Sequence, residues 1–138
     1  MSLAHFTEAQ APVWDLALAE LQAGCKQGHW MWFIFPQLAA LGRSQMAMRY
    51  GIADLAEARA YMAHALLGDR LRVAAEAVTR HPDRTARDIM GGVDAVKLRS
   101  SMTLFERAAP KCAVFAQVIE RFHDGARCPL TLAELSGG

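Results

Sequence analysis

Two stretches of the sequence hold most of the residues whose types and spacing could do chemistry. The first, HWMWFIFPQ, contains His29, Trp30, Trp32 and Gln37. Tryptophan rings can sandwich a base or a sugar ring while a histidine and a glutamine orient it, which is how mostly apolar pockets gain specificity. Aromatic clusters of this kind are also typical of a protein core. The stretch therefore predicts either one wall of a ligand pocket or a core segment with a polar edge at His29 and Gln37.

The second stretch, KLRSSMTLF, combines cationic and hydroxyl-bearing side chains, namely Lys97, Arg99, Ser100 and Ser101. A helix capped by Asp94 would place Lys97 in its first turn, where the positive end of the helix macrodipole disfavours a cation by roughly 0.3–1 kcal/mol. A bound anion would offset that cost, and the two glycines before the helix allow a close approach of the backbone to a ligand. We interpret this stretch as a site for a phosphate or carboxylate group.

Two other interpretations of the second stretch stay open. A desolvated lysine could take the proton of a serine one turn away, so Lys97 and Ser101 could form a nucleophilic Ser–Lys pair. That spacing also occurs by chance on many helices, and this interpretation is the least favoured. In the purely structural alternative, Lys97 pairs with Asp88 or Asp94, and the serine hydroxyls bond back to helix carbonyls.

Composition and charge exclude several classes of function. The 138 residues are 53% hydrophobic and 21% charged, which is typical of a folded globular domain. Fifteen Lys and Arg residues oppose fourteen Asp and Glu residues, so the overall field that draws a protein onto nucleic acid is missing, and no nucleic-acid partner is expected. The longest apolar run is 30–35, far shorter than the roughly 20 residues that cross a bilayer, so no membrane partner is expected either.

Metal ions and common cofactors are not expected. The five histidines form none of the usual metal-ligand spacings, and the chain contains no dinucleotide fingerprint, Walker loop or hydrolase nucleophile elbow. The three cysteines, Cys25, Cys112 and Cys128, are odd in number and widely spaced. This pattern predicts free thiols in a reducing cytoplasm.

The elements that must position these side chains are predicted to be helices, because apolar residues recur at helical spacing along most of the chain. We expect an all-α fold, a compact single-domain bundle of about six to seven orthogonally packed helices. The domain spans 1–138, with an ordered core over about 6–125 and a short C-terminal tail. The predicted segments are a helix from about Thr7 to Gly24, a short helix or irregular segment at WMWFIFP, alanine-rich helices from Ser44 that break at Gly51 and restart at Asp54, a helix that stops before Pro82, a short turn capped by Thr85, a helix capped by Asp94, and a last long helix over 114–122.

Three strings, HWMWFIFPQLAALGRS, EARAYMAHALLGDRL and GGVDAVKLRSSMTLFERA, resemble a small, mainly bacterial family numbered 1810 among domains of unknown function. The resemblance covers roughly Phe6 to Gly125 and implies a mostly α-helical single domain without an established activity. The family is often labelled calpastatin, but that inhibitor is a long flexible repeat chain, whereas this composition is compact. A fainter similarity is to hydrolases of ADP-ribose and N-glycosidic bonds, whose glutamate-bearing motif is not matched.

The two stretches support three hypotheses for function. One is a pocket for a small anionic or nucleotide-like ligand between the stretches, which requires that they meet and that Lys97 is not fully paired inside the protein. Another is a protein-interaction or scaffold domain without catalysis, which requires exposed tryptophans. The third is a hydrolase of ADP-ribose or N-glycosidic bonds. The residues expected to line the pocket are His29, Trp30, Trp32, Gln37, Lys97, Arg99, Ser100 and Ser101.

Overall fold

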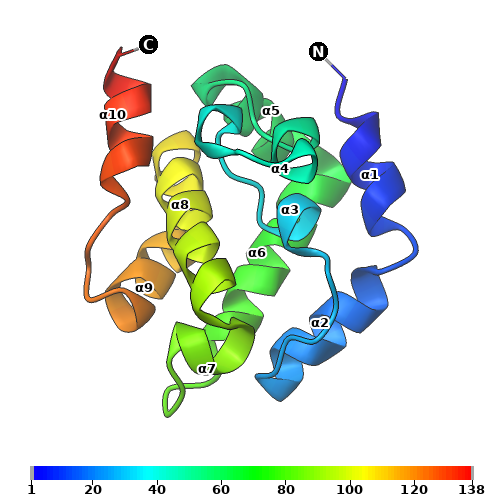
Figure 1. The fold of residues 1–138 in the computed structure, drawn as a ribbon, viewed down its shortest axis with the longest axis vertical. Helices are drawn as coiled ribbons and strands as arrows, with labels where there is room; N and C mark the ends of the chain where they lie inside the picture. Colours follow the sequence, from blue (N-terminus) through cyan, green and yellow to red (C-terminus); the bar gives the residue numbers. More distant parts are fainter. Residues whose placement is uncertain (1, 138) are drawn as a thin grey trace.

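The computed structural model describes residues 2–137 and shows an all-α protein (Figure 1). Over those residues the chain forms ten α-helices and one short 3₁₀ helix, with a single isolated bridge between Leu38 and Ile52 in place of any strand. The prediction of a mainly helical fold is confirmed. The helices are α1 (Ala4–Gln10), α2 (Trp14–Ala23), α3 (Met31–Ile34), η1 (Ala39–Leu41), α4 (Gln45–Arg49), α5 (Leu55–Ala63), α6 (Ala65–Thr79), α7 (Ala86–Met90), α8 (Gly92–Ala108), α9 (Ala113–Phe122) and α10 (Pro129–Gly137).

The count of helices exceeds the prediction partly because the expected first helix is two helices, α1 and α2. Pro12 lies between them, and a proline has no N–H to donate to the preceding turn. Thr7 is not a cap but an interior residue of α1, where its hydroxyl donates to the carbonyl of Ala4 at 2.9 Å. Gly24 ends α2 in the left-handed conformation with φ of 72°, as the sequence predicts.

The C-terminal segment differs more from the expectation. In place of a short tail after Gly125, the chain forms α10, which packs on α8 and η1. Its first residue is Pro129, a position where the missing N–H costs nothing. Thr131 is fully buried and Leu135 packs partly against the core, so this helix is stabilised by tertiary contacts.

Local capping signals in the middle of the chain were predicted correctly. Ser44 accepts the N–H of Ala47 at 3.1 Å, and Asp54 accepts the N–H of Glu57 at 2.8 Å. Thr85 forms a reciprocal capping box with the third residue of α7. The following helix, α8, begins two residues before Asp94, so this aspartate lies in the first turn and is not the cap.

A chain of aromatic contacts joins distant parts of the sequence in one core. The ring of Tyr61 lies 5.2 Å from that of Phe6 and 5.2 Å from that of Phe105, and Phe105 in turn lies 6.1 Å from Phe115. These contacts connect α1, α5, α8 and α9. Since α8 also packs against α7 and α10, it is the helix around which the others are placed. In Figure 1 the segment that leads from α3 to η1 runs beside α8.

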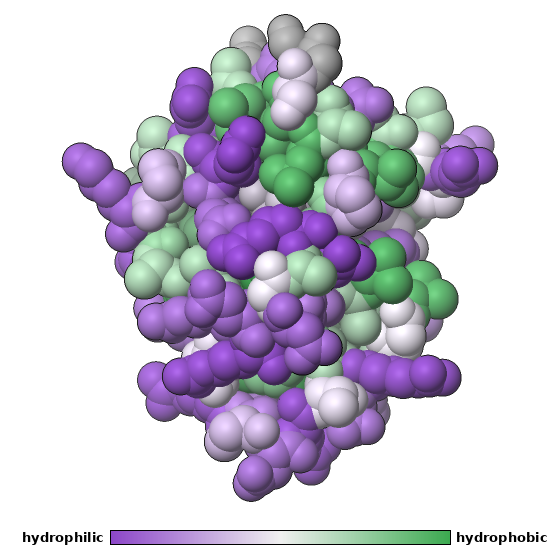
Figure 2. Space-filling model, turned by 90° about the vertical axis from the view of Figure 1, so that its left-hand side faces the viewer, coloured by the Kyte–Doolittle hydropathy of each residue, from purple (hydrophilic) through white to green (hydrophobic). Residues whose placement is uncertain are grey.

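The surface around α10 is mixed in character. Figure 2 shows hydrophilic side chains over most of the lower half of this face, with apolar side chains gathered in its upper part and along one edge. Within residues 2–137, no helix combines the length and the apolar composition needed to cross a membrane.

Candidate functional site

The two stretches singled out in the sequence meet at Lys97 and Trp32. Lys97 projects from the second turn of α8, and its Nζ atom lies 5.1 Å from the ring centroid of Trp32 on α3. This distance is within the range of a cation–π contact. Trp32 is partly buried, and the Lys97 side chain keeps 24% of its surface exposed. The contact is therefore at the surface of the protein and not inside its core.

An aspartate and a second lysine complete the charges around this contact. One carboxylate oxygen of Asp94 lies 2.9 Å from the Nζ atom of Lys26, and the other lies 3.7 Å from the Nζ atom of Lys97. The side chain of Lys26 is only 7% exposed and its Nζ atom lies 4.9 Å from the ring centroid of Trp30. Asp94 compensates for a cation in the first turns of α8, but its closer partner is Lys26. Lys97 is left with one long ionic contact.

Two buried hydrogen-bond donors near Lys97 lack a partner among residues 2–137. They are the indole Nε1 of Trp32 and the hydroxyl of Ser101, which is fully buried one helical turn after Lys97 on the same face of α8. An indole N–H can only donate, and a buried donor without an acceptor costs roughly 1–3 kcal/mol. Together with Lys97 they form a group of donors that has too few acceptors.

Glu20 organises the loop that carries Lys26 and Trp30. Its carboxylate accepts the backbone N–H groups of Gln27 and Gly28, both at 2.9 Å, and the indole N–H of Trp30 at 3.0 Å. Burial alone would raise the pKa of Glu20, but these hydrogen bonds outweigh it and lower the pKa below the usual value. The sequence showed residues 24–29 only as a polar loop and contained no signal for this arrangement.

The remaining members of the first stretch lie apart from the donor group. Trp30 is 1% exposed and belongs to the core, with its N–H held by Glu20. His29 is exposed on the loop before α3. Gln37 is partly buried, and its backbone carbonyl accepts the N–H of Ile52 at 2.9 Å, which aligns the segment after α3 with the segment before α5.

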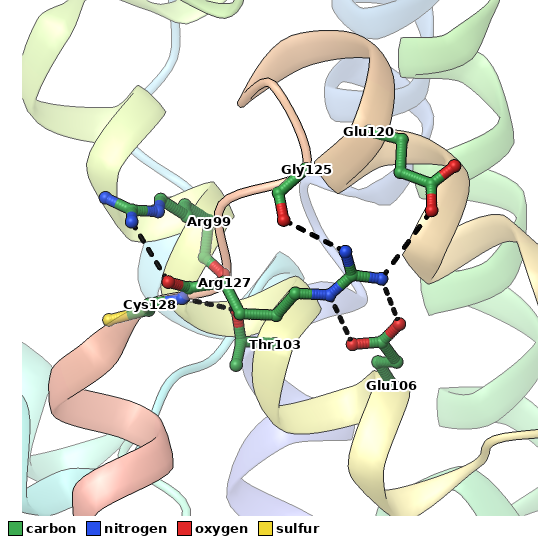
Figure 3. A network of polar contacts seen from close by, with 7 residues as sticks. All are labelled: Arg99, Thr103, Glu106, Glu120, Gly125, Arg127 and Cys128. Carbon is green, nitrogen blue, oxygen red and sulfur yellow. Dashed lines mark hydrogen bonds and ion pairs between the residues drawn. The ribbon is translucent and has the colours of Figure 1, made fainter.

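Arg99 and Ser100 of the second stretch contact the segment before α10 (Figure 3). The guanidinium of Arg99 donates to the carbonyls of Ala126 at 2.7 Å and Arg127 at 3.0 Å. The hydroxyl of Ser100 is 3.3 Å from the carbonyl of Val96 and 3.3 Å from the sulfur of Cys128. Both side chains are thus engaged in holding the C-terminal segment and are not free donors beside Lys97.

Arg127 anchors the same segment to the other end of α8. Its guanidinium binds both carboxylate oxygens of Glu106, at 3.0 and 2.6 Å, and donates to the carbonyl of Gly125 at 3.0 Å (Figure 3). The paired carboxylate raises the pKa of Arg127 further above its usual value. The backbone N–H of Cys128 donates to the hydroxyl of Thr103 at 3.0 Å. This network fixes the start of α10 against α8.

Cys128 is a buried thiol directly before α10. Burial opposes its ionisation, but hydrogen bonds from Ser100, Thr131 and the backbone N–H of Leu130 outweigh burial and lower the pKa of the thiol. The residue is only 7% exposed, so this sulfur is shielded from substrates in solution. We regard it as a cap for α10.

Two hollows in the surface lie away from Lys97. One is between α2 and α6. The other, with a volume of about 440 Å³, is bounded by η1, the start of α5 and the end of α10. Across the described range 2–137, no three His, Cys, Asp or Glu residues are grouped in a way that could hold a metal ion.

A family model for a protein of unknown function, DUF1810, matches residues 1–135. The chain belongs to the DUF1810 family. The crystal structure of the conserved hypothetical protein Rv1873 from Mycobacterium tuberculosis is similar to it, with a TM-score of 0.96 and 46% sequence identity over 97% of this chain and 96% of that one. No curated protein matches the chain. For this member of DUF1810, these comparisons establish the fold and the family, and the function has to be argued from the side chains.

Proposed function

We propose that the protein binds a small anionic ligand where Lys97 lies over Trp32. The observation that carries the proposal is the excess of donors there. The ammonium of Lys97, the indole N–H of Trp32 and the hydroxyl of Ser101 are matched only by the long contact to Asp94. An anion with several oxygen atoms supplies the acceptors that these groups lack, and hydrogen bonds to a charged partner are the stronger kind.

The chemistry of these side chains indicates how a ligand would enter. Lys97 covers the face of Trp32, and its long, partly exposed side chain can move without disturbing the backbone. A ligand that draws the ammonium away from the ring would come into reach of the two buried donors. Phosphate and carboxylate groups both meet this requirement.

The alternatives receive less support from the described residues. An exposed aromatic patch for a protein partner would have to do without Trp30, which is 1% exposed. A Ser–Lys nucleophile would need an accessible serine, but Ser101 is fully buried and Ser100 is 4% exposed. No observation favours hydrolysis of ADP-ribose or an N-glycosidic bond over binding alone.

A reducing compartment such as the bacterial cytoplasm is the setting that we propose for this activity. Cys25, Cys112 and Cys128 are all free, and Cys25 is exposed. An exposed free thiol is kept reduced most easily where thiol reductants are abundant.

Isothermal titration of phenyl phosphate, benzoate and inorganic phosphate tests the anion site. We expect saturable binding of at least one of these anions by the wild-type protein and a loss of affinity of at least about tenfold in Lys97→Met, because the only mobile cation of the site is removed. Lys111→Met is the matched control, since Lys111 is an exposed lysine outside the site. The proposal is wrong if the wild type binds none of the three anions, or if Lys97→Met binds as tightly as the wild type.

A further inference from the structure

We propose that Asp94 is a built-in competitor of the anion for Lys97, and that Lys26 controls the affinity of the site by drawing Asp94 away. This inference rests on the proposed anion site and concerns its regulation. Neither residue has to touch the ligand. Asp94 and Lys26 act as positioning residues through their charges.

The distances show which lysine holds the carboxylate. Asp94 lies 2.9 Å from the ammonium of Lys26 but 3.7 Å from that of Lys97. The Lys26 pair is also the more buried, with its lysine side chain 7% exposed against 24% for Lys97. Water and salt screen a buried pair less than an exposed one, so Lys26 neutralises most of the charge of Asp94.

Lys26 is fixed by contacts that do not involve Lys97. Its backbone N–H donates to the carbonyl of Ile89 at 2.6 Å, and its ammonium donates to the carbonyl of Gly28 and lies over the ring of Trp30. Trp30 is in turn held by Glu20. The position of Lys26 is therefore set by the 24–29 loop and by the end of α7, so Lys26 cannot follow an incoming ligand.

Asp94 is also held independently of Lys97. It lies in the first turn of α8, where the helix macrodipole favours a negative charge. Of the three charged groups, the ammonium of Lys97 is thus the one that can move. An anion has to break only its long contact with Asp94. Without Lys26, the carboxylate would be free to pair fully with Lys97 and exclude the anion.

The formal charges of four proteins make the inference quantitative. Lys26, Asp94 and Lys97 sum to +1 in the wild type, to 0 in Lys26→Met, to +2 in Asp94→Asn and again to +1 in the double variant. We expect Lys26→Met to bind phenyl phosphate about five- to tenfold more weakly than the wild type, and Asp94→Asn to bind it more tightly by a similar factor. In the double variant Lys97 has no competitor, so affinity should return to within about threefold of the wild type.

The experiment is isothermal titration of phenyl phosphate into all four proteins, with Lys97→Met and Lys111→Met alongside. Rescue of Lys26→Met by Asp94→Asn supports the inference, because a variant that merely disturbed the 24–29 loop would not be rescued by removing a charge on α8. If Lys26→Met does not fold, Asp94→Asn alone decides, and unchanged or weaker binding by that variant overturns the inference. Unchanged affinity in Lys26→Met, or a double variant as weak as Lys26→Met, also overturns it. In each of these cases a loss of binding in Lys97→Met shows that the anion site itself stands.

Discussion

At the scale of single residues, Glu20 does more for the candidate site than its place on an exposed-looking helix suggests. Its carboxylate accepts three N–H groups from Gln27, Gly28 and Trp30 and so shapes the loop that presents Lys26. The pKa of Glu20 is lowered in the folded protein, so its charge stabilises the fold above its usual pKa of 4.5, and this contribution disappears on acidification below that value.

We predict that Glu20→Gln lowers the free energy of unfolding by about 1–3 kcal/mol at pH 7, because hydrogen bonds to a charged acceptor are replaced by weaker ones. Urea denaturation at pH 7 and at pH 3.5 measures the effect, which should shrink at the lower pH. Glu8→Gln on the exposed side of α1 is the control and should change stability little at either pH. An effect of equal size for Glu8 and Glu20 would contradict this role for the carboxylate.

Cys128 gives a second prediction at this scale. Because its pKa is lowered in the folded protein, the thiolate form stabilises the fold, and this contribution grows as the pH rises through the lowered pKa and is complete above the usual thiol value. The stability difference between the wild type and Cys128→Ser should therefore be larger at pH 9.5 than at pH 7, as measured by urea denaturation. A difference that stays constant or shrinks as the pH rises would show that the thiol does not ionise more readily in the fold.

At the scale of elements, the start of α10 depends on two arginines that reach it from different directions. Arg99 binds the carbonyls of residues 126 and 127, and Arg127 binds Glu106 on α8. We expect Arg127→Met to increase amide hydrogen exchange in α10 by roughly tenfold or more, since a bidentate charged contact is lost. Hydrogen exchange with mass spectrometry measures this. Arg72→Met removes the exposed pair with Asp69 and should leave α10 unchanged. Equal protection of α10 in both variants would count against the network.

The elements also show which parts of the fold the sequence could predict. Caps at Ser44, Asp54 and Thr85 and the end of α2 at Gly24 were predicted because each involves residues within a few positions of one another. The helix α10 was missed because contacts from residues more than twenty positions earlier in the chain hold it. Helical periodicity cannot reveal such contacts.

The candidate site was predictable in part for the same reason. Lys97 stood out because a cation in the first turns of a helix needs an explanation, and this argument uses only local sequence. Its neighbours could not be found in this way. Lys26 and Glu20 come from a loop about seventy residues earlier, and Arg99 and Ser100, which lie beside Lys97 in the sequence, contact the segment before α10.

At the scale of the whole molecule, the aromatic core from α1 to α9 holds α8 in place, and α8 in turn carries Lys97 to the ring of Trp32. The family and the similar structure from Mycobacterium tuberculosis share this architecture over almost the full chain. A fold does not by itself define an activity, so the functional argument depends on the donor group around Lys97.

The most direct test of that argument observes the indole N–H of Trp32 by nuclear magnetic resonance. The protein has three tryptophans, Trp14, Trp30 and Trp32, and their indole signals can be assigned by substitution. On titration with phenyl phosphate we predict a saturable shift of the Trp32 indole signal, much smaller shifts for the other two, and no shift in Lys97→Met. A Trp32 signal that stays in place while phenyl phosphate binds, or one that shifts equally in Lys97→Met, would contradict an anion site at Lys97.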